Sequence, residues 1–367
     1  MKIDILLPFK EKFSISSASA VSITVLNAFE YSRFKKNILI YGQNISNPFL
    51  KENFCGLESN WILHRGHNKS IAYNYYKKNL EHKNEKKIIE VHNRPYIFHY
   101  LKKKIKDKPI TLHFHNDPQT MKGSKTIKER EMIAQSAAAV YFVSNFIKEK
   151  FTTGLKKNYN NLYTLYNSVQ RKIDHQPFKK KLVLFVGRLV EEKGCHIFVQ
   201  AIKNIVKDFQ DWNFLIIGAE RAGQTKLKSK FEKKLITEFL SLGSNTKYLG
   251  FAANEIVKEK MIESSVLVIP SIWDEPLGVV AIEGLCYANA IITTSTGGLP
   301  EVVDDNGIVI DNLNIDNLSQ KIFLLLSNDK IREKYQKKAW ENYNFNASEI
   351  TIKQDAIRSK IFNNFYE

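Results

Sequence analysis

Short apolar runs alternate along this chain with longer segments of helical periodicity, and this alternation is typical of parallel α/β sheets. The helical segments are 19–34, 97–106, 125–137, 192–209 and 255–264. The predicted strands are KIDILLPF (2–9), NILIYGQ (37–43), KIIEVHN (87–93), ITLHFHN (110–116), AAVYFVS (138–144), KLVLFVGR (181–188), NFLIIGAE (213–220), KYLGF (247–251), SVLVIPS (265–271) and AIITTS (290–295).

The strands form two series separated by the hydrophilic stretch QRKIDHQPFKKK (170–181). A chain of 367 residues exceeds the usual size of one core, so two domains are expected. We predict a Rossmann-like domain at 1–170, a second at 171–345, and a helix at 346–367 that packs back on the first domain. Ligands of doubly wound sheets bind at the carboxyl ends of the strands, so we expect the two domains to face across a ligand-binding cleft.

The chain carries a formal net charge of +17, much of it in lysine tracts such as LKKKIKDK (101–108). This balance favours anionic partners: nucleic acid, acidic lipid headgroups or phosphorylated small molecules. Solvated faces of a lysine-rich protein would give the same composition. RNP, KH and helix-turn-helix patterns are absent from the sequence, so we expect no nucleic-acid partner.

The three cysteines, Cys55, Cys195 and Cys286, are too widely spaced for a disulfide framework or a zinc motif. This usage fits a reducing cytosol. The longest apolar stretches fall short of the ~20 residues of a membrane span. We therefore expect a cytoplasmic protein, attached at most to a membrane surface.

The segment SIWDEPLGVVAIEGL (271–285) follows a predicted strand and leads into a helical pattern. Pro276 suits the start of a helix, because its missing N–H would be unpaired there in any case. Gly278 allows a ligand to approach the backbone closely. The sequence predicts a helix N-terminus that binds an anion.

Two glutamates, Glu275 and Glu283, stand eight positions apart in this segment. A helix throughout would separate them by about 12 Å, more than the carboxylate pair of a glycosidase requires. One interpretation is that they hold the two ends of a long ligand, with a phosphate between them, as in a nucleotide sugar. The alternative is a surface turn, with Glu275 solvated and Glu283 paired to a lysine.

A second strand, glycine turn and helix occurs in FVGRLVEEKGCH (185–196), which contains Arg188 and Lys193. The guanidinium matches phosphate oxygens in a planar fork, and the ammonium is a mobile point charge. Two cations beside a diphosphate would stabilise the charge that develops as a glycosidic bond breaks.

Together, GRLVEEKG (187–194) and PSIWDEPLGVVAIEGLCYANAIITTSTGGLPEVV (270–303) resemble the donor half of the GT-B retaining glycosyltransferases of family four. The resemblance implies a GT-B fold of two Rossmann-like domains, the first binding the acceptor and the second the nucleotide-sugar donor. It maps Glu275 and Glu283 onto the E-x7-E motif, and Arg188 and Lys193 onto the diphosphate-binding cations. Pro276, Leu277 and Gly278 would line the donor site with them.

The first half departs more from the family. Its loop KEKFSISSASA (10–20) has small residues where the family commonly has a glycine pair. The strand end ITLHFHNDP (110–118) lies where the family often places an active-site histidine near the sugar. The resemblance favours His115 for this catalytic role, with His113, on the same strand face, as the alternate. Asp117 follows closely and is a candidate for acceptor contact.

The segment EVHNRPYI (90–97) is similar to one in bacterial family-four enzymes that build surface saccharides. The similarity implies that His92, Asn93 and Arg94 line the acceptor side. Arg94 would meet an acidic or phosphorylated acceptor, or would pair with Glu90.

The resemblance implies transfer of a hexosyl-type group, with retention, from a nucleotide-diphosphate sugar to a saccharide or lipid-linked saccharide in surface polysaccharide or lipopolysaccharide biosynthesis. It implies no metal and no cofactor beyond the donor, and the basic charge suggests an anionic inner-membrane surface at the cytoplasmic face. The alternatives are a GT-B sugar-nucleotide epimerase and a basic nucleic-acid-binding protein. A dehydrogenase is disfavoured, since IIGAERAG (216–223) is not G-x-G-x-x-G.

Overall fold

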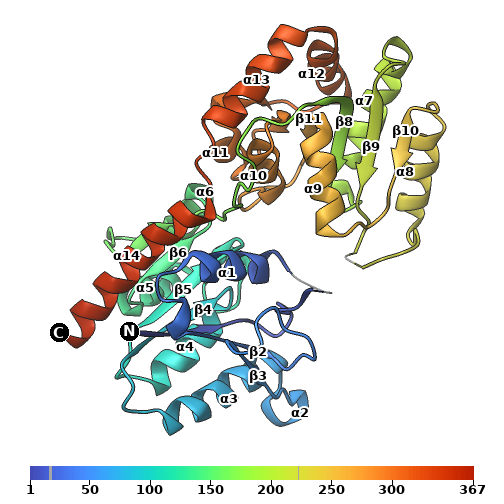
Figure 1. Ribbon diagram of the computed structural model, residues 1–367. Coiled ribbons are helices and arrows are strands. Elements are labelled where there is room, and N and C mark those ends of the chain that lie inside the picture. Colours follow the sequence, from blue (N-terminus) through green and yellow to red (C-terminus); the bar gives the residue numbers. More distant parts are fainter. Residues whose placement is uncertain (16–18, 222) are drawn as a thin grey trace. The chain divides into compact units, whose positions relative to one another are not determined.

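The computed structural model of the protein describes residues 1–15, 19–221 and 223–367 (Figure 1). The chain divides into two compact units. Unit 1 comprises Met1–Ser168 and Ala347–Glu367, and unit 2 comprises Val169–Asn346.

In the described residues, unit 1 contains a seven-stranded parallel sheet in the order β3-β2-β1-β4-β5-β6-β7. The chain therefore starts in the middle of the sheet, winds outward to β3, then crosses over to β4. The elements are β1 Lys2–Leu6, α1 Ala20–Tyr31, β2 Ile38–Gln43, β3 Phe54–Leu57, α2 Trp61–His64, α3 His67–Glu81, β4 Lys87–His92, α4 Pro95–Lys104, β5 Ile110–Phe114, α5 Ile127–Ser136, β6 Val140–Phe142, α6 Asn145–Thr152, β7 Leu162–Thr164 and α14 Ala347–Tyr366, with short 3-10 turns η2 Lys35–Asn37 and η3 Pro118–Thr120.

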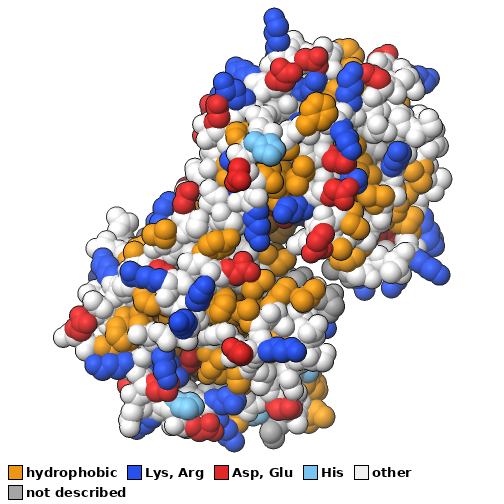
Figure 2. Space-filling model, in the orientation of Figure 1, with side chains coloured by type: hydrophobic (Ala, Val, Ile, Leu, Met, Phe, Trp, Pro, Cys, Tyr) orange, Lys and Arg blue, Asp and Glu red, His pale blue; other side chains and the backbone are white. Residues whose placement is uncertain are grey.

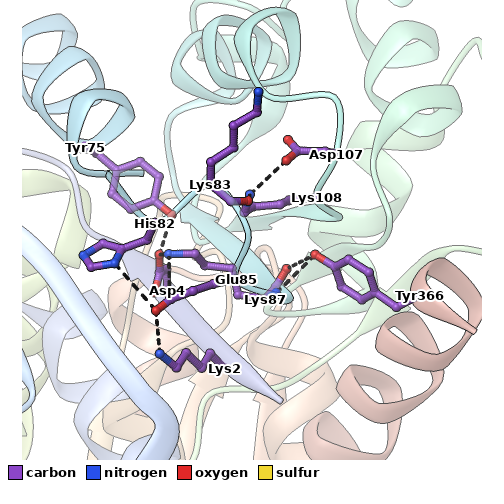
Figure 3. Close-up of polar contacts among 10 residues, drawn as sticks. All are labelled: Lys2, Asp4, Tyr75, His82, Lys83, Glu85, Lys87, Asp107, Lys108 and Tyr366. Atoms are coloured by element: carbon purple, nitrogen blue, oxygen red, sulfur yellow. Dashed lines mark hydrogen bonds and ion pairs between the residues drawn. The ribbon is translucent and has the colours of Figure 1, made fainter. Parts of the chain in front are cut away.

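A buried polar network joins the strands of unit 1 at the start of β4 (Figure 3). The Lys87 ammonium donates to Asp4 at 2.9 Å, and the Tyr75 hydroxyl donates to the same carboxylate at 2.7 Å. The hydroxyl of Tyr366, near the end of α14, bonds both the N–H and the carbonyl of Lys87. The network thus ties the last helix of the chain to the sheet that its first residues form.

The position of α14 along unit 1 is visible in Figure 1, where it lies beside α1. Its apolar contacts include Ile361, which packs with Ile88 and Tyr141 of the sheet. The Arg358 guanidinium, which is fully buried, forms two bonds to Glu90 of β4, at 2.9 and 2.7 Å. A buried charge is stable only when it is paired in this way.

Unit 2 repeats the winding pattern, with a parallel sheet in the order β10-β9-β8-β11-β12-β13 over its described residues. Its elements are β8 Lys180–Val186, η4 Glu191–Lys193, α7 Cys195–Ile205, η5 Val206–Asp208, β9 Asn213–Ile217, α8 Lys230–Leu240, β10 Thr246–Tyr248, α9 Asn254–Glu263, β11 Ser264–Ile269, α10 Val279–Cys286, β12 Ala290–Thr294, α11 Leu299–Val303, η6 Asp304–Asn306, β13 Ile308–Ile310, α12 Ile315–Ser327 and α13 Asp329–Glu341.

The core of unit 2 follows from its sequence periodicity. In α7 the residues Cys195, Phe198, Val199, Ile202 and Ile205 recur at helical spacing, and all are buried. They pack with apolar residues of the central strands and of α8 and α12. The central strands are apolar on both faces, as expected where helices cover both sides of a parallel sheet.

These observations confirm the predicted α/β class of two Rossmann-like parallel sheets. The observed strands are mostly shorter at their carboxyl ends than predicted: the first ends at Leu6 rather than at residue 9. The edge strands β3, β7 and β13 were not predicted, because three or four residues show no periodicity. Among the described residues, every helix is too short or too polar to cross a bilayer.

Candidate functional site

In unit 2 the predicted donor residues follow two neighbouring strands, β8 and β11. These strands are the two at which the winding of the sheet changes direction, and crevices at such points bind ligands. Arg188 and Lys193 lie in the segment after β8, and Glu275 lies in the turn after β11. The topology therefore brings the basic pair and the first glutamate to one edge of the sheet.

Lys193 and Glu275 form an ion pair. The carboxylate is buried and also accepts a bond from the Ser271 hydroxyl at 2.9 Å. The Lys193 ammonium lies 5.4 Å from the ring centre of Trp273, whose side chain remains two-fifths exposed. Glu275 is thus held in place by its neighbours, and the interpretation of a solvated Glu275 is wrong.

Arg188 is exposed, and its guanidinium lies 3.5 Å from the Glu192 carboxylate. An exposed pair at this distance is weak, so the guanidinium can exchange its partner for a ligand phosphate at little cost. Gly194 ends the turn that contains Lys193 and leads into α7, and its φ is 65°. A Cβ there would lie 1.8 Å from the carbonyl oxygen of Pro270, so this turn requires glycine where it contacts the end of β11.

The predicted helix after Glu275 is α10, and it begins at Val279 with Gly278 as its N-cap. Pro276 therefore does not start the helix as predicted; it lies in the non-helical turn before it. The buried Leu277 anchors this turn. The first turn of α10 leaves backbone N–H groups without intrahelical partners at the same edge of the sheet, as an anion site requires.

Glu283 lies in the middle of α10 and is half-buried. Burial raises the pKa of its carboxyl to about 7. Its carbonyl accepts the Tyr287 N–H, but its carboxyl has no ion pair or hydrogen bond among the residues that the structure describes, so its predicted pairing with a lysine is absent there. A partly buried carboxyl without a partner can accept hydroxyl groups of a ligand.

The loop TGGLPEVV (296–303) supports the Glu275 turn from the other side. The N–H of Gly298 donates to the Glu275 carbonyl at 2.7 Å. Gly297 has φ 61°, and a Cβ there would lie 2.2 Å from the same carbonyl oxygen. Two residues that the sequence did not single out, Ser271 and Gly297, therefore shape this turn. The sequence signals that could have found them are a polar residue at the end of a predicted strand, for Ser271, and a pair of glycines, for Gly297.

In unit 1 the histidines at the carboxyl ends of β4 and β5 come together. His92 Nδ1 and His115 Nε2 are 3.0 Å apart and share a hydrogen bond. His113 is buried and stacks on His92, with ring centres 4.2 Å apart. Burial lowers the pKa of all three imidazoles, and a neighbouring imidazole lowers each further, so all three are neutral near pH 7.

The other predicted acceptor residues surround this group. Asn93 is buried at φ 52° and accepts the His115 N–H at 3.2 Å, which joins the ends of β4 and β5. Arg94 is half-buried and donates to the Asn93 carbonyl, whereas Glu90 is bound by Arg358. The alternative in which Arg94 pairs with Glu90 is therefore wrong. Asp117 accepts the Gln119 N–H at 2.7 Å. In the loop 10–20, residues 16–18 lie outside the described residues.

One group in the described part of the chain has side-chain atoms close enough to share a metal. The ligand atoms of Glu90, His92 and His113 lie within 4.8 Å of one another. However, the two rings are stacked at 12°, so their lone pairs lie in nearly parallel planes and do not converge. Arg358 also bonds both oxygens of Glu90. This geometry does not suit a metal ion.

Residues 166–342 match the family described as glycosyl transferases, group 1. This match begins just before Val169, where unit 2 starts, and ends close to the end of that unit. Spore coat protein SA of Bacillus subtilis is 29% identical over 271 residues, which cover 68% of this chain and 71% of that protein. An uncharacterized glycosyltransferase of Methanocaldococcus jannaschii is 33% identical over 229 residues, 61% of this chain and 60% of the relative. The chain thus matches about three fifths of the archaeal relative.

The similarity in fold extends over both units of the chain. The crystal structure of Anabaena HepE in complex with UDP matches with a TM-score of 0.75 and 16% identity, covering 98% of this chain and all of that one. At this identity the similarity establishes the fold alone. The chain has the GT-B fold, and the matched segment 166–342 contains the residues of the candidate donor site.

Proposed function

We propose that the protein is a retaining glycosyltransferase, which moves a hexosyl-type group from a nucleotide-diphosphate sugar to a saccharide or lipid-linked saccharide in surface polysaccharide or lipopolysaccharide biosynthesis. One observation carries the proposal. In a segment that matches the group 1 glycosyl transferases, the carboxyl ends of β8 and β11 bring together two cations, a helix N-terminus and a buried glutamate.

On this proposal the diphosphate lies against Arg188, Lys193 and the start of α10. Lys193 would leave its ion pair with Glu275 for the phosphate, or bridge the two, and the carboxylate would then be free to accept sugar hydroxyls. Glu283 would accept the ribose hydroxyls. Because the cations and the helix start face the charge that develops on the leaving diphosphate, they would supply most of the catalytic stabilisation.

The acceptor is proposed to bind in unit 1, at the edge formed by His115, Arg94 and Asp117. Retention would follow from attack on the face that the diphosphate leaves, with the departing phosphate oxygen taking the acceptor proton. Asp117 already accepts a backbone N–H, so it is proposed to orient the acceptor rather than to form a covalent intermediate.

No metal is required by this mechanism, because two cations of the chain already face the phosphate charge. The non-converging ligands of Glu90, His92 and His113 support the same proposal. Transfer activity in EDTA should stay within about twofold of the activity without EDTA. A change of this size corresponds to less than the free energy of one hydrogen bond. Loss of activity in EDTA with recovery on adding Mg²⁺ would contradict it.

The net charge of +17 supports an acceptor on an anionic membrane surface at the cytoplasmic face. Lysines near such a surface contribute about 1 kcal/mol each. On the face drawn in Figure 2, basic and acidic side chains are interspersed on each unit, so a single basic patch is not evident there. Co-sedimentation with anionic but not neutral liposomes is the expected result, and equal binding to both would contradict it.

A two-step experiment tests the function. Thermal-shift screening against UDP-, GDP-, ADP- and TDP-sugars should identify one donor, since a ligand at a hundred times its Kd adds about 2.7 kcal/mol of stability. Product analysis with that donor and saccharide acceptors should then show a lengthened saccharide with the anomeric configuration retained. Free nucleotide with an epimerised or hydrolysed sugar, and no elongation, would contradict the transferase proposal.

A further inference from the structure

A small, partly open pocket lies in unit 1, and its lining is mostly apolar. Its volume is about 30 Å³. The polar side chains that face it include Glu90, His92, His113, His115, Tyr141 and Arg358. His92 Nε2, His113 Nε2 and the Tyr141 hydroxyl are buried atoms that lack a partner among the described residues. The histidines thus line a mostly apolar pocket that contains three polar atoms without a described partner.

The positions of these rings are fixed by packing. His113 is stacked between His92 and Tyr141, with ring centres 4.2 and 4.3 Å away. Beneath them Arg358 bonds both oxygens of Glu90 and also Asp355, at 2.9 Å. The strands β4, β5 and β6 and the helix α14 therefore hold His92 in a single orientation behind His115.

Both rings are neutral, so in the hydrogen bond between His92 and His115 one of the two facing nitrogens carries the proton and the other accepts it. If His115 were the donor, His92 would carry its proton on Nε2, a buried atom without a partner. If His92 Nδ1–H is the donor, Nε2 of His92 is instead an unpaired acceptor. Orphaned buried N–H groups are rarer in proteins than under-satisfied acceptors, so the second arrangement is favoured.

The consequence falls on the outer atom of His115. When its Nε2 accepts from His92, a neutral His115 carries its proton on Nδ1. His115 is only partly buried, and its Nδ1 atom has no hydrogen bond to the described residues, so Nδ1 is the ring atom left for a ligand. His115 then offers a donor to the site and has no lone pair left to accept a proton.

We infer that His92 is a positioning residue that fixes His115 as the Nδ1-protonated tautomer, so that His115 acts as a hydrogen-bond donor to a sugar oxygen and not as the base that deprotonates the acceptor. Only the statement that His115 contacts a sugar oxygen rests on the proposed function. The tautomer itself is a property of unit 1 without ligand. It gives His92 a role behind His115, rather than in direct contact with the acceptor.

The direct test is long-range ¹H–¹⁵N NMR of the full-length protein with ¹⁵N-labelled histidine, with the His115→Gln variant assigning the signals of His115 among the nine histidines. The expected spectrum shows His115 protonated at Nδ1 and unprotonated at Nε2 near pH 7. Protonation of His115 at Nε2 would overturn the inference.

Two variants extend the test. His92→Asn keeps an N–H near the position of Nδ1 and should preserve both the tautomer and most of the activity. His92→Leu removes the donor; it should abolish the tautomer preference and lower kcat about tenfold, the value of one hydrogen bond, with UDP affinity unchanged. An unchanged tautomer in His92→Leu would overturn the inference. If His92→Leu does not fold, the wild-type spectrum and His92→Asn still decide.

The outcomes separate the two proposals. If the spectrum shows the expected tautomer but His115→Gln retains full transfer activity, the catalytic role of His115 fails and the positioning by His92 stands. If the tautomer is wrong while His115→Gln is inactive, the role of His115 stands and the inference about His92 fails.

Discussion

At the scale of single residues, the cations of the candidate donor site are paired with carboxylates in the structure, and the proposed function requires them to exchange these partners for a ligand. Lys193 is paired with Glu275 in the structure, and Arg188 lies near Glu192. An anionic ligand competes with these carboxylates for the cations. The pairs balance the charge of the site in the absence of ligand, which limits the cost of partly burying Lys193.

Replacing Lys193 with alanine should lower kcat by about a hundredfold or more, because an ammonium that faces developing phosphate charge is lost. Steady-state kinetics with the identified donor measure this. Lys203→Ala is the matched control, since Lys203 is an exposed lysine of α7 whose ammonium lies 3.6 Å from Glu238. Near wild-type activity in Lys193→Ala would remove the lysine from the mechanism.

The raised pKa of Glu283, about 7, predicts that donor binding is coupled to proton release. Ribose hydroxyls donate to the carboxylate, so binding favours its ionised form and lowers its pKa. About half a proton should leave per molecule of the identified donor bound at pH 7, and affinity should rise with pH from 6 to 8.

Calorimetry of the identified donor in two buffers of different ionisation enthalpy measures this proton release. Glu283→Gln should bind that donor more weakly and release no proton over this range. Identical proton release in the variant would assign the effect to another group.

At the scale of elements, the positions of the site residues depend on close backbone contacts between loops. The turn at Glu275 packs on Gly297 and Gly298, and the turn at Lys193 packs through Gly194 on Pro270. These contacts exclude a Cβ, so the loops can only be this close with glycine at those positions.

Gly297→Ala should destabilise unit 2 by about 3 kcal/mol or more, because it combines a left-handed backbone with a Cβ 2.2 Å from the Glu275 carbonyl oxygen. Gly223→Ala is the control: Gly223 has φ 76° but open space around its Cβ position, so about 1 kcal/mol is expected. Urea unfolding measures both. Equal losses would show that the close contact contributes nothing.

Arg358→Met should destabilise unit 1 by about 3–5 kcal/mol, because it leaves the buried Glu90 carboxylate without its charge partner. The exposed Lys360, in the same helix α14, provides the control variant Lys360→Met, which should change stability by less than about 0.5 kcal/mol. Denaturant unfolding followed by circular dichroism measures the difference. A small effect of Arg358→Met would mean that Glu90 becomes protonated or solvated without cost.

At the scale of the whole molecule, the two units differ in what is buried near their sites. Unit 1 buries neutral histidines beside an ion pair, and unit 2 presents cations and carboxylates at its edge. This difference makes the stability of unit 1 sensitive to acid.

The pKa values of His92, His113 and His115 lie below their unfolded value of about 6.5. The unfolded chain therefore binds more protons as pH falls below 6.5, and the free energy of unfolding of unit 1 should fall with it. Each histidine contributes up to about 1.4 kcal/mol per pH unit, until its folded pKa is reached.

Hydrogen exchange of peptides from β4 and β5 between pH 7 and 5, corrected for intrinsic rates, follows this loss locally. His113→Phe keeps a ring between His92 and Tyr141 but cannot titrate, so the pH slope should fall by about a third. A slope unchanged by this substitution would assign the acid sensitivity to other groups.

The sequence by itself determined the fold class and the chemistry of the donor edge. Its apolar runs specified parallel strands buried on both faces, and its motifs in 185–196 and 270–303 marked the residues that follow β8 and β11. These signals are local: a strand, a turn and a helix start each depend on a few neighbouring residues.

Only the tertiary structure decided which partners the charged and polar residues take. Glu90 pairs with Arg358, 268 positions away, and not with the nearby Arg94 that the sequence suggested. Glu275 is buried against Lys193 and Ser271, and His92 lies behind His115. Such pairs form because parallel strands and crossover helices bring distant segments together, and no local pattern records the distance between their side chains.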